Sequence, residues 1–194
     1  MLQDPGVACR SVVAVFLWFL GYPDQALKSI QEALTQAEGL SHPFTLGHTL
    51  LFAGALHQLR REGQLAQERA EAVIALAIEQ EFSFWLAGGT FQRGSALAEQ
   101  GQEEEGIAQM RQGMEAAQAT GAQIERPRML ALLAEMHGKV GQVEEGLNLL
   151  DEATAVMLKT GQHNCEAELH RLKGELTLQK LSLISSQLSV PSTQ

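Results

Sequence analysis

Two short groups of polar side chains are the first candidates for chemistry in this 194-residue chain. One of them, Gly89-Thr-Phe-Gln-Arg-Gly94-Ser95, has the glycine spacing of a phosphate-binding loop but no lysine before its serine. That lysine is the main partner of the β- and γ-phosphates, and a phosphate-binding loop also follows an apolar strand, which is missing here. We therefore interpret the segment as a helix whose small residues lie at a crowded helix contact.

The other group lies between His163 and His170 and contains Cys165, Glu166 and Glu168. On a helix, Glu166 and His170 share one face at i, i+4 spacing. Zinc, however, requires four convergent ligands with supporting hydrogen bonds behind them. The group is interpreted as the ordinary start of a helix, and we expect neither a metal nor a cofactor.

No arrangement for nucleophilic catalysis stands out. Such catalysis needs a serine or cysteine, a base and a group that orients the base. His42, His48, His57 and His137 are scattered, and no Gly-x-Ser-x-Gly turn accompanies them. Paired carboxylates are frequent, but they fall in the first turns of predicted helices, where acidic residues are favoured. We expect the protein not to be an enzyme.

A recurring turn positions these residues. Gly21, Gly63, Gly101 and Gly141 each follow one amphipathic segment and open another, at spacings of 42, 38 and 40 residues. A turn that recurs about every 40 residues between helical segments is typical of a helix-hairpin solenoid. The sequence therefore predicts an all-α, right-handed solenoid of antiparallel hairpins with about nine helices.

The predicted organisation is one repeat domain over residues 1–180. The expected units are repeats at 4–39, 41–81, 83–120 and 123–160, a half repeat at 164–180, and a disordered serine-rich tail at 181–194. A small residue follows the turn glycine by five positions at Ala26, Gly106 and Gly146. The second repeat is expected to break this rule with Glu68 and to displace its small residue to Ala70.

Composition excludes several classes of partner. The formal net charge of −9 disfavours binding to phosphate backbones, so we expect no nucleic-acid partner. The apolar run over residues 12–20 is too short to span a bilayer and lacks the flanks of a secretory signal, so no membrane partner is expected. Cys9 and Cys165 lie near opposite ends of the chain and are predicted to be free thiols in the cytoplasm.

The turn glycine, the small residue five positions later and the alanines beyond it resemble the tetratricopeptide repeat. Several strings are more specifically similar to the degenerate repeat region of large bacterial signalling proteins. Those proteins join an adenylate or guanylate cyclase, kinase or DNA-binding domain to a STAND-type ATPase and then to such repeats. The strings are Asp4-Pro-Gly-Val7, Leu20-Gly-Tyr-Pro-Asp-Gln-Ala-Leu27, His57-Gln-Leu-Arg-Arg-Glu62, Phe84-Trp-Leu-Ala-Gly-Gly-Thr90, Leu97-Ala-Glu-Gln-Gly101 and Ala167-Glu-Leu-His-Arg-Leu-Lys-Gly-Glu-Leu176.

The resemblance covers about residues 4–180 and implies a regulatory or interaction segment without cyclase activity. It implies that a peptide or partner domain binds in a concave groove lined by the first helix of each hairpin. Arginines in this groove would suit an acidic peptide, although solvated charge at helix ends and aromatic packing between repeats are alternatives. The groove candidates are His57, Arg60, Arg61, Trp85, Phe91, Arg93, Arg128 and Glu135, with Phe82 and Phe84 in the same aromatic group.

Two other functions stay open. Long-period repeats in maltotriose-responsive transcription activators bind a sugar, so a small-molecule sensor is an alternative. A self-associating structural fragment is another, because the first helix is apolar nearly all round and exposed apolar patches drive association. The expected homodimer contact consists of Val12, Val15, Phe16, Trp18 and Phe19. The chain is interpreted as a piece of a longer signalling array or as a stand-alone derivative of one.

Overall fold

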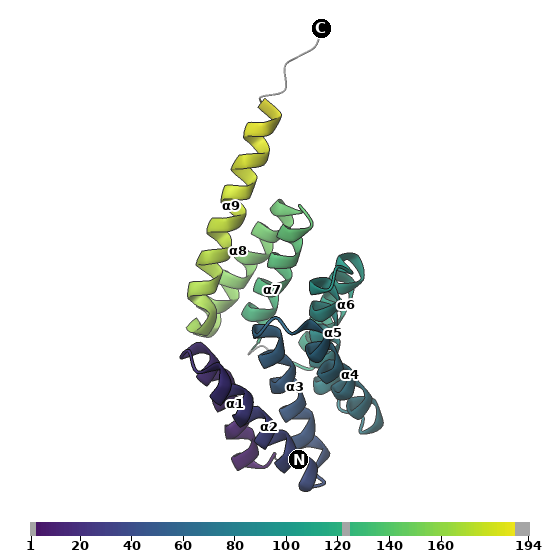
Figure 1. Cartoon of the computed structure of the whole chain (residues 1–194). Coiled ribbons are helices and arrows are strands. Elements are labelled where there is room, and N and C mark those ends of the chain that lie inside the picture. The colour runs from purple at the N-terminus through teal and green to yellow at the C-terminus, as the bar shows by residue number, and fades with distance from the viewer. Residues whose placement is uncertain (1–2, 122–124, 189–194) are drawn as a thin grey trace. The chain divides into compact units, whose positions relative to one another are not determined.

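The computed structural model describes residues 3–121 and 125–188, which form nine α-helices and no strand (Figure 1). This confirms the predicted all-α architecture of helix hairpins. The first helices of the hairpins, called A helices, are α1 (Pro5–Phe19), α3 (Pro43–Leu59), α5 (Ser83–Glu99), α7 (Arg126–Lys139) and α9 (Glu166–Leu188). The second, or B, helices are α2 (Pro23–Gly39), α4 (Gly63–Glu79), α6 (Glu103–Ala119) and α8 (Val143–Thr160), and a 3-10 turn at His163–Cys165 precedes α9.

Left-handed residues separate the helices at intervals of 20 positions. They are Gly21, Ser41, Arg61, Glu81, Gly101, Gly121, Gly141 and Gly161, with φ between 50° and 88°. The repeat is therefore 40 residues long without insertion or deletion across all eight turns. The prediction that Gly63 forms the second hairpin turn is wrong, because Arg61 occupies that place and Gly63 is the first residue of α4.

Each A-to-B turn closes with the same backbone hydrogen bond. The N–H of the residue after the left-handed position donates to the carbonyl five residues earlier, as from Glu62 to His57 at 2.9 Å and from Gln142 to His137 at 2.8 Å. This bond satisfies a carbonyl that the helix end would otherwise leave unpaired. With Arg61 as the turn residue, Ala66 becomes the small residue five positions later, and it is buried. The predicted break at Glu68 and displacement to Ala70 are therefore also wrong.

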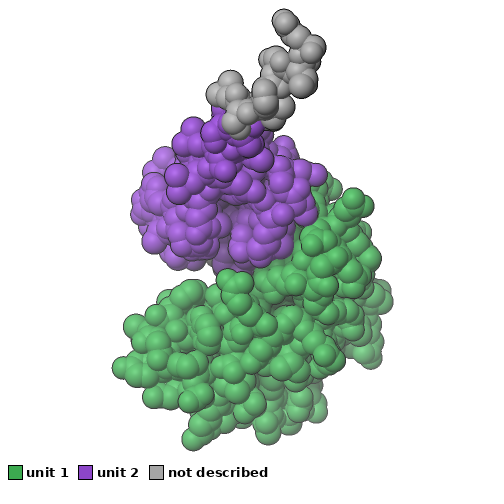
Figure 2. Space-filling view, turned by 45° about the horizontal axis from the view of Figure 1, so that its top comes forward, with its two compact units in different colours: residues 1–121 green, residues 122–194 purple. Residues whose placement is uncertain are grey.

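The described chain forms two compact units, shown in different colours in Figure 2. Unit 1, Met1–Gly121, contains the three hairpins α1 to α6, and its core includes the fully buried Ile30, Leu56 and Val73. Unit 2, Ala122–Gln194, contains α7, α8 and α9 around the buried Leu130 and Leu150. A single continuous domain over 1–180 stays a prediction.

Helix α9 differs from the sequence expectation at its far end. It is helical through Leu188, whereas disorder was predicted from residue 181. Leu181 stands 20 residues after Gly161, where the earlier repeats have a left-handed residue. A leucine is costly in that conformation, so the helix continues instead of turning. Residues 189–194 of the predicted tail, and the first two residues of the predicted repeat at 123–160, lie outside the described residues.

Candidate functional site: the open face of the A helices

In α1, α3, α5 and α7, one face packs on the B helix of the same hairpin. In α5 this face includes Gly94 and Ala98, which approach Gly106 of α6 so closely that a methyl group on Gly106 would lie 2.6 Å from the Ala98 nitrogen. Phe91 lies on the same face. A methyl group added to Gly113 of α6 would lie 2.5 Å from the Phe91 backbone nitrogen. No side chain on this face of α5 is free to meet a ligand.

In α3, α5 and α9, a second face packs on the B helix of the preceding hairpin. A methyl group on Gly89 of α5 would lie 3.0 Å from side-chain carbons of Val73 and Ile74 in α4. Gln100, after the end of α5, donates to Oε1 of Gln67 in α4 at 2.9 Å.

The positions between those two faces form what we call the open face, because no B helix covers it. Its members recur at 40-residue spacing in the three A helices of unit 1. They are Ala8, Val12, Val15 and Phe19 in α1; Phe44, His48, Phe52, Ala55 and Leu59 in α3; and Phe84, Gly88, Gln92, Ser95 and Glu99 in α5. Apart from His48, Gln92, Ser95 and Glu99 the face is apolar, with four phenylalanines, and it differs from the arginine-lined surface that the sequence predicted.

Aromatic rings from α3 and α5 make a connected cluster at the open face. The ring of Trp85 lies 5.0 Å from that of Phe44 and 4.7 Å from that of Phe84, measured between centroids. His48 stacks on Phe52 at 4.5 Å. Trp85 is buried because the absence of a side chain at Gly47 leaves room for its ring, whereas Phe84 stays 44% exposed.

Three buried polar atoms in this region have no hydrogen-bond partner among the described residues. They are Nδ1 of His48, Nε1 of Trp85 and Oε1 of Gln92. The amide nitrogen of Gln92 is used, since it donates to the Leu51 carbonyl at 2.9 Å. Burial lowers the pKa of His48, which favours its neutral form. Buried polar atoms in folded proteins are nearly always paired. Three unpaired atoms beside one aromatic cluster therefore make this surface a candidate binding site.

Three of the predicted groove residues are buried and do not present a binding surface. His57 faces the turn into α4, where its Nδ1 lies 2.7 Å from Oε2 of Glu62. Phe91 packs against α6, and Trp85 fills the space between α3 and α5. For His57 the register was counted from Gly63 rather than from Arg61, which shifts the assigned face of α3. Trp85 and Phe91 lie in α5, whose turn at Gly101 is as predicted, and they are buried by packing against α3 and α6.

The predicted arginines do not converge on one basic surface. Arg60 pairs with Glu62 at 2.8 Å and lies over the Trp18 ring, 5.9 Å from its centroid. The hydrogen bond from Arg60 lowers the pKa of Glu62 and raises that of Arg60 itself. Arg93 donates to Oε1 of Gln109 at 2.8 Å, and Arg61 is exposed in the turn.

In unit 2, the predicted Arg128 and Glu135 take open-face positions of α7 and are engaged in local ion pairs. Arg128 lies 2.8 Å from Oε2 of Glu125, and Glu135 lies 3.1 Å from Nζ of Lys139. Arg126 pairs with Glu152 of α8. These contacts neutralise the cations locally, which removes the physical reason to expect an acidic peptide here.

The five predicted self-association residues of α1 divide into two groups. Phe16 and Phe19 are exposed, whereas Val12, Val15 and Trp18 are half-buried. Trp18 packs on the core of unit 1, and Val12, Val15 and Phe19 belong to the open face.

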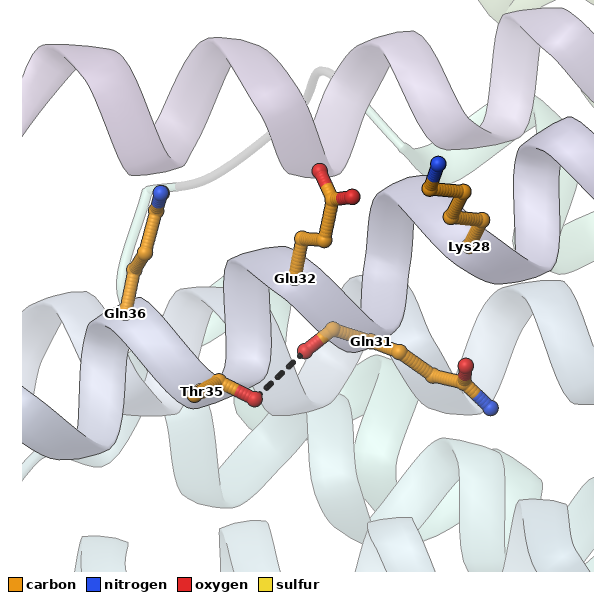
Figure 3. A pocket seen from close by; sticks show the side chains of 5 residues that line it. All are labelled: Lys28, Gln31, Glu32, Thr35 and Gln36. Atoms are coloured by element: carbon orange, nitrogen blue, oxygen red, sulfur yellow. Dashed lines mark hydrogen bonds between the residues drawn. The ribbon is translucent and has the colours of Figure 1, made fainter.

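Other candidate sites show no converging chemistry. A surface hollow on α2 is lined by Lys28, Gln31, Glu32, Thr35 and Gln36, and Thr35 Oγ1 donates to the Gln31 carbonyl at 3.1 Å (Figure 3). Glu32 is engaged with Arg10 of α1, and the remaining charge of the hollow is the single exposed ammonium of Lys28, which by itself does not define a site.

The described residues contain no cluster of three or more metal-binding side chains, and His163 pairs with Glu166 at 3.1 Å. Both cysteines are free; Cys9 is exposed, and burial raises the pKa of Cys165. In the described part of the chain, no helix combines the length and apolar character needed to cross a bilayer.

No protein-family model and no curated protein matches the chain significantly. Solved structures do match. The apo form of RapI is 12% identical with a TM-score of 0.67, over 96% of this chain and 72% of that one. A putative kinesin light chain from Podosopora anserina with nearly identical TPR-like repeats is 20% identical with a TM-score of 0.58, over 97% and 100%.

Aspartyl phosphate phosphatase F from Bacillus subtilis is 12% identical with a TM-score of 0.64. The aligned region covers 96% of this chain but only about half (51%) of that protein. Similarity at these identities establishes the fold, which is a TPR-like helical repeat. Similarity at this level does not identify a partner or an activity for this chain.

Proposed function

We propose that the chain is a non-catalytic interaction module that binds an apolar segment of a protein partner on the open face of α1, α3 and α5. The observation that carries this proposal is the composition of that face. Phe19 and Phe84 are exposed, and Phe52 is half-buried. His48 and Gln92 add buried polar atoms without partners. The TPR-like fold supports the proposal, since solenoids build extended surfaces for binding.

The size of the available interactions constrains the partner. Full burial of one aromatic side chain contributes about 1.5–3 kcal/mol, and a hydrogen bond adds about 1 kcal/mol. Association costs at least about 4 kcal/mol in lost freedom of motion. One ring falls short of this cost, and two rings with a hydrogen bond exceed it by at most about 3 kcal/mol, which corresponds to binding weaker than millimolar. We therefore expect the bound segment to extend over all three A helices of unit 1.

A randomised peptide-display selection against the full chain tests this proposal. We expect enriched peptides to be apolar and to lose binding at least tenfold to the variants Phe84→Glu and Phe52→Glu. Leu158→Glu, which places the same charge on the exposed side of α8, is the matched control and should bind as the unsubstituted chain does. Peptides that bind all four proteins equally would contradict the proposed surface.

A small-molecule sensor, for example of a sugar, is the second candidate. The unpaired donor Nε1 of Trp85 and the acceptor Oε1 of Gln92 beside aromatic rings provide the two kinds of contact that sugars use. A thermal-shift screen with oligosaccharides separates the candidates, because a ligand that binds the folded state raises the melting temperature. A sugar-dependent shift that His48→Gln or Gln92→Leu abolishes would favour the sensor.

Self-association through α1 is a further part of the proposal, supported by the exposure of Phe16 and Phe19. We also propose that the chain derives from, or belongs to, a bacterial signal-transduction protein with cyclase or kinase and ATPase modules, and that it works in the cytoplasm. The resemblance of its repeat strings to such proteins supports the origin, and two unpaired thiols support the reducing compartment.

A further inference from the structure

Exposed large apolar side chains gather on two helices, α1 and α9, which are the purple and yellow helices of Figure 1. Both are A helices, and the 40-residue periodicity tells which neighbour each of them lacks. The faces concerned are largely distinct from the open face, and the inference rests on the proposed self-association through α1, for which it names the opposing surface.

On α1, the exposed residues Cys9, Val13, Phe16 and Leu20 form one stripe at i, i+4, i+7 and i+11. Val13 is 48%, Phe16 59% and Leu20 70% exposed. We call this set the α1 stripe. The residues 40, 80 and 120 positions after Cys9 and Phe16 are all buried. For Cys9 they are Thr49, Gly89 and Met129; for Phe16 they are Leu56, Ala96 and Met136.

The buried counterparts identify what is missing from α1. Gly89, the counterpart of Cys9 in α5, packs on Val73 and Ile74 of α4, and Gln100, the counterpart of Leu20, bonds to Gln67 of α4. The α1 stripe therefore corresponds to the face that in α5 receives the preceding B helix. Among the described residues, none covers it.

On α9, the corresponding vacancy is on the side of its own B helix. Ala167, Arg171, Gly174 and Leu178 are all exposed. Their counterparts in α5 are Ala87, Phe91, Gly94 and Ala98, which pack on α6. Nothing lies within 4 Å of a methyl group placed on Gly174, and Leu178 is 69% exposed. With Leu181, these residues form what we call the α9 stripe.

We propose that the α1 stripe of one copy packs on the α9 stripe of a second copy, which joins copies head to tail. Among the described residues each stripe lacks a B helix, and in this docking the A helix of the other copy takes its place. An antiparallel alignment that places Phe16 over Gly174 brings Val13 near Leu178 and Cys9 near Leu181, because both sets of three positions span seven residues, in steps of three and four on α1 and of four and three on α9. Phe16 then fills the space that Gly174 leaves open, as Trp85 does at Gly47.

The charges at the contact are compatible with this docking. The α1 stripe carries no ionisable group except the Cys9 thiol. On α9, Arg171 is held by Glu168 and Glu175, each at 2.5 Å, so docking buries no isolated charge. The two stripes differ from each other, so the interface is heterologous and each copy retains one free stripe of each kind at the ends of the assembly.

Complementation between two variants tests the proposal. Phe16→Glu disables the α1 stripe and Leu178→Glu disables the α9 stripe; both positions are exposed, and circular dichroism verifies that each variant is folded. In light scattering at about 100 μM, we expect the unsubstituted chain to exceed the monomer mass and each variant alone to be monomeric. Their equimolar mixture should have twice the monomer mass, since one intact stripe of each kind remains. Ile78→Glu on α4 is the matched control and should behave as the unsubstituted chain.

Three outcomes would overturn the inference. They are a monomeric unsubstituted chain, association that either variant retains on its own, and a mixture that stays monomeric. Retained association in Leu178→Glu alone would indicate symmetric pairing of two α1 helices instead.

Cross-linking tests the alignment independently. In a Cys165→Ser background, Leu181→Cys should form a disulfide with Cys9 of another copy, with oxidised glutathione accepting the two electrons and two protons of the thiols. Leu183→Cys, on the opposite side of α9, is the control and should cross-link at least tenfold less. Equal cross-linking of both positions, or cross-linking that persists in Cys9→Ser, would exclude the proposed contact.

Discussion

At the scale of single residues, the turns show where the chain carries strain. Five of the eight left-handed positions are glycine, but Ser41, Arg61 and Glu81 are not. A non-glycine residue in this conformation costs about 1 kcal/mol or more. All three strained turns border α3 or α4 in unit 1, so the strain lowers the stability of unit 1 around these two helices.

Glycine substitution at the strained turns should therefore stabilise unit 1. We expect Arg61→Gly and Glu81→Gly each to raise the free energy of unfolding by about 0.5–1 kcal/mol. Gly101→Ala should lower it by about 1 kcal/mol, and since nothing lies within 4 Å of the added methyl group, backbone strain is the sole cause. Urea denaturation measures all three. A destabilised Arg61→Gly variant would show that contacts of the arginine outweigh its strain.

His48 should make stability depend on pH near neutrality. Its pKa is lowered by burial, so the unfolded chain binds the proton more readily than the folded chain does. The stabilising contribution is complete above the unfolded pKa, about 6.5, and is lost as the pH falls from there toward the folded pKa. We expect the melting temperature to fall between pH 7.5 and 5.5, and to fall less in His48→Gln.

His163→Gln is the control for this measurement, because His163 is exposed and pairs only locally with Glu166. It should keep the pH dependence of the unsubstituted chain. The carboxylates Glu62 and Glu168, whose pKa values are lowered by hydrogen bonds from Arg60 and Arg171, act at lower pH. Their contributions are lost as the pH falls below about 4.5, outside the tested window.

At the scale of elements, α5 and α6 are joined through glycines rather than through large side chains. Gly94, Gly106 and Gly113 let the two backbones approach until a methyl group on any of them would lie within 2.6 Å of backbone atoms. The counterparts of Gly106 in the first two repeats are Ala26 and Ala66. The third hairpin is therefore packed more tightly than the others, although the sequence pattern treats these positions alike.

Gly106→Ala should be far more costly than its conservative appearance suggests. The methyl group would meet the Ala98 nitrogen and the Gly94 carbonyl, both part of a helix backbone that cannot rotate away. We expect a loss of about 2–3 kcal/mol, the scale of overpacking in a core, in urea denaturation. Gly39→Ala, with no atom within 4 Å of the new methyl group, should leave stability unchanged or raise it.

At the scale of the whole molecule, α9 is covered over only part of its surface. Leu169 and Leu176 are buried in unit 2, whereas Leu181, Leu183 and Ile184 are exposed. Few apolar contacts hold the second half of the helix, and such segments open at low free-energy cost.

Hydrogen exchange of the dilute chain should therefore be fast at residues 178–186 and slow at 169–176. Raising the concentration should slow exchange at 178–186 if a second copy covers them, and it should leave exchange in α8 unchanged. Uniform protection along α9 in the dilute chain would contradict the exposure described here.

How much was predictable differs between the fold and the site. The all-α repeat architecture followed from the 3.6-residue pattern, the prolines of the first turns and the recurring glycines, which are local signals. The second turn was assigned to Gly63 because glycine favours a left-handed conformation, whereas nothing in the sequence marks Arg61 as left-handed. That slip of two residues shifted the assigned face of α3 and misplaced His57. Trp85 and Phe91 lie in α5, whose turn at Gly101 was predicted correctly, and packing against α3 and α6 buries them.

The open face was missed for a related reason. Phe44, His48 and Phe52 lie at spacings of four residues, and Phe44 and Phe84 lie 40 apart, so a strict 40-residue alignment would have found them. A looser alignment hides them among the other apolar residues of α3, which are buried on nearly every side. Arginines stand out in the sequence of an acidic chain. In the structure, however, Arg60, Arg93 and Arg128 each contact a nearby polar side chain and do not form a common surface.

By itself the sequence determined that this protein is a run of short helices with a 40-residue repeat, because helix periodicity, capping and turn glycines act within a few residues. Only the tertiary structure decided that the repeat is free of insertions, that Arg61 turns the second hairpin, and which faces of α1 and α9 lack a helix. These properties depend on contacts between residues about 40 positions apart. A backbone conformation forced on a non-glycine residue, or a face left uncovered, becomes visible only when the neighbouring repeats are in place.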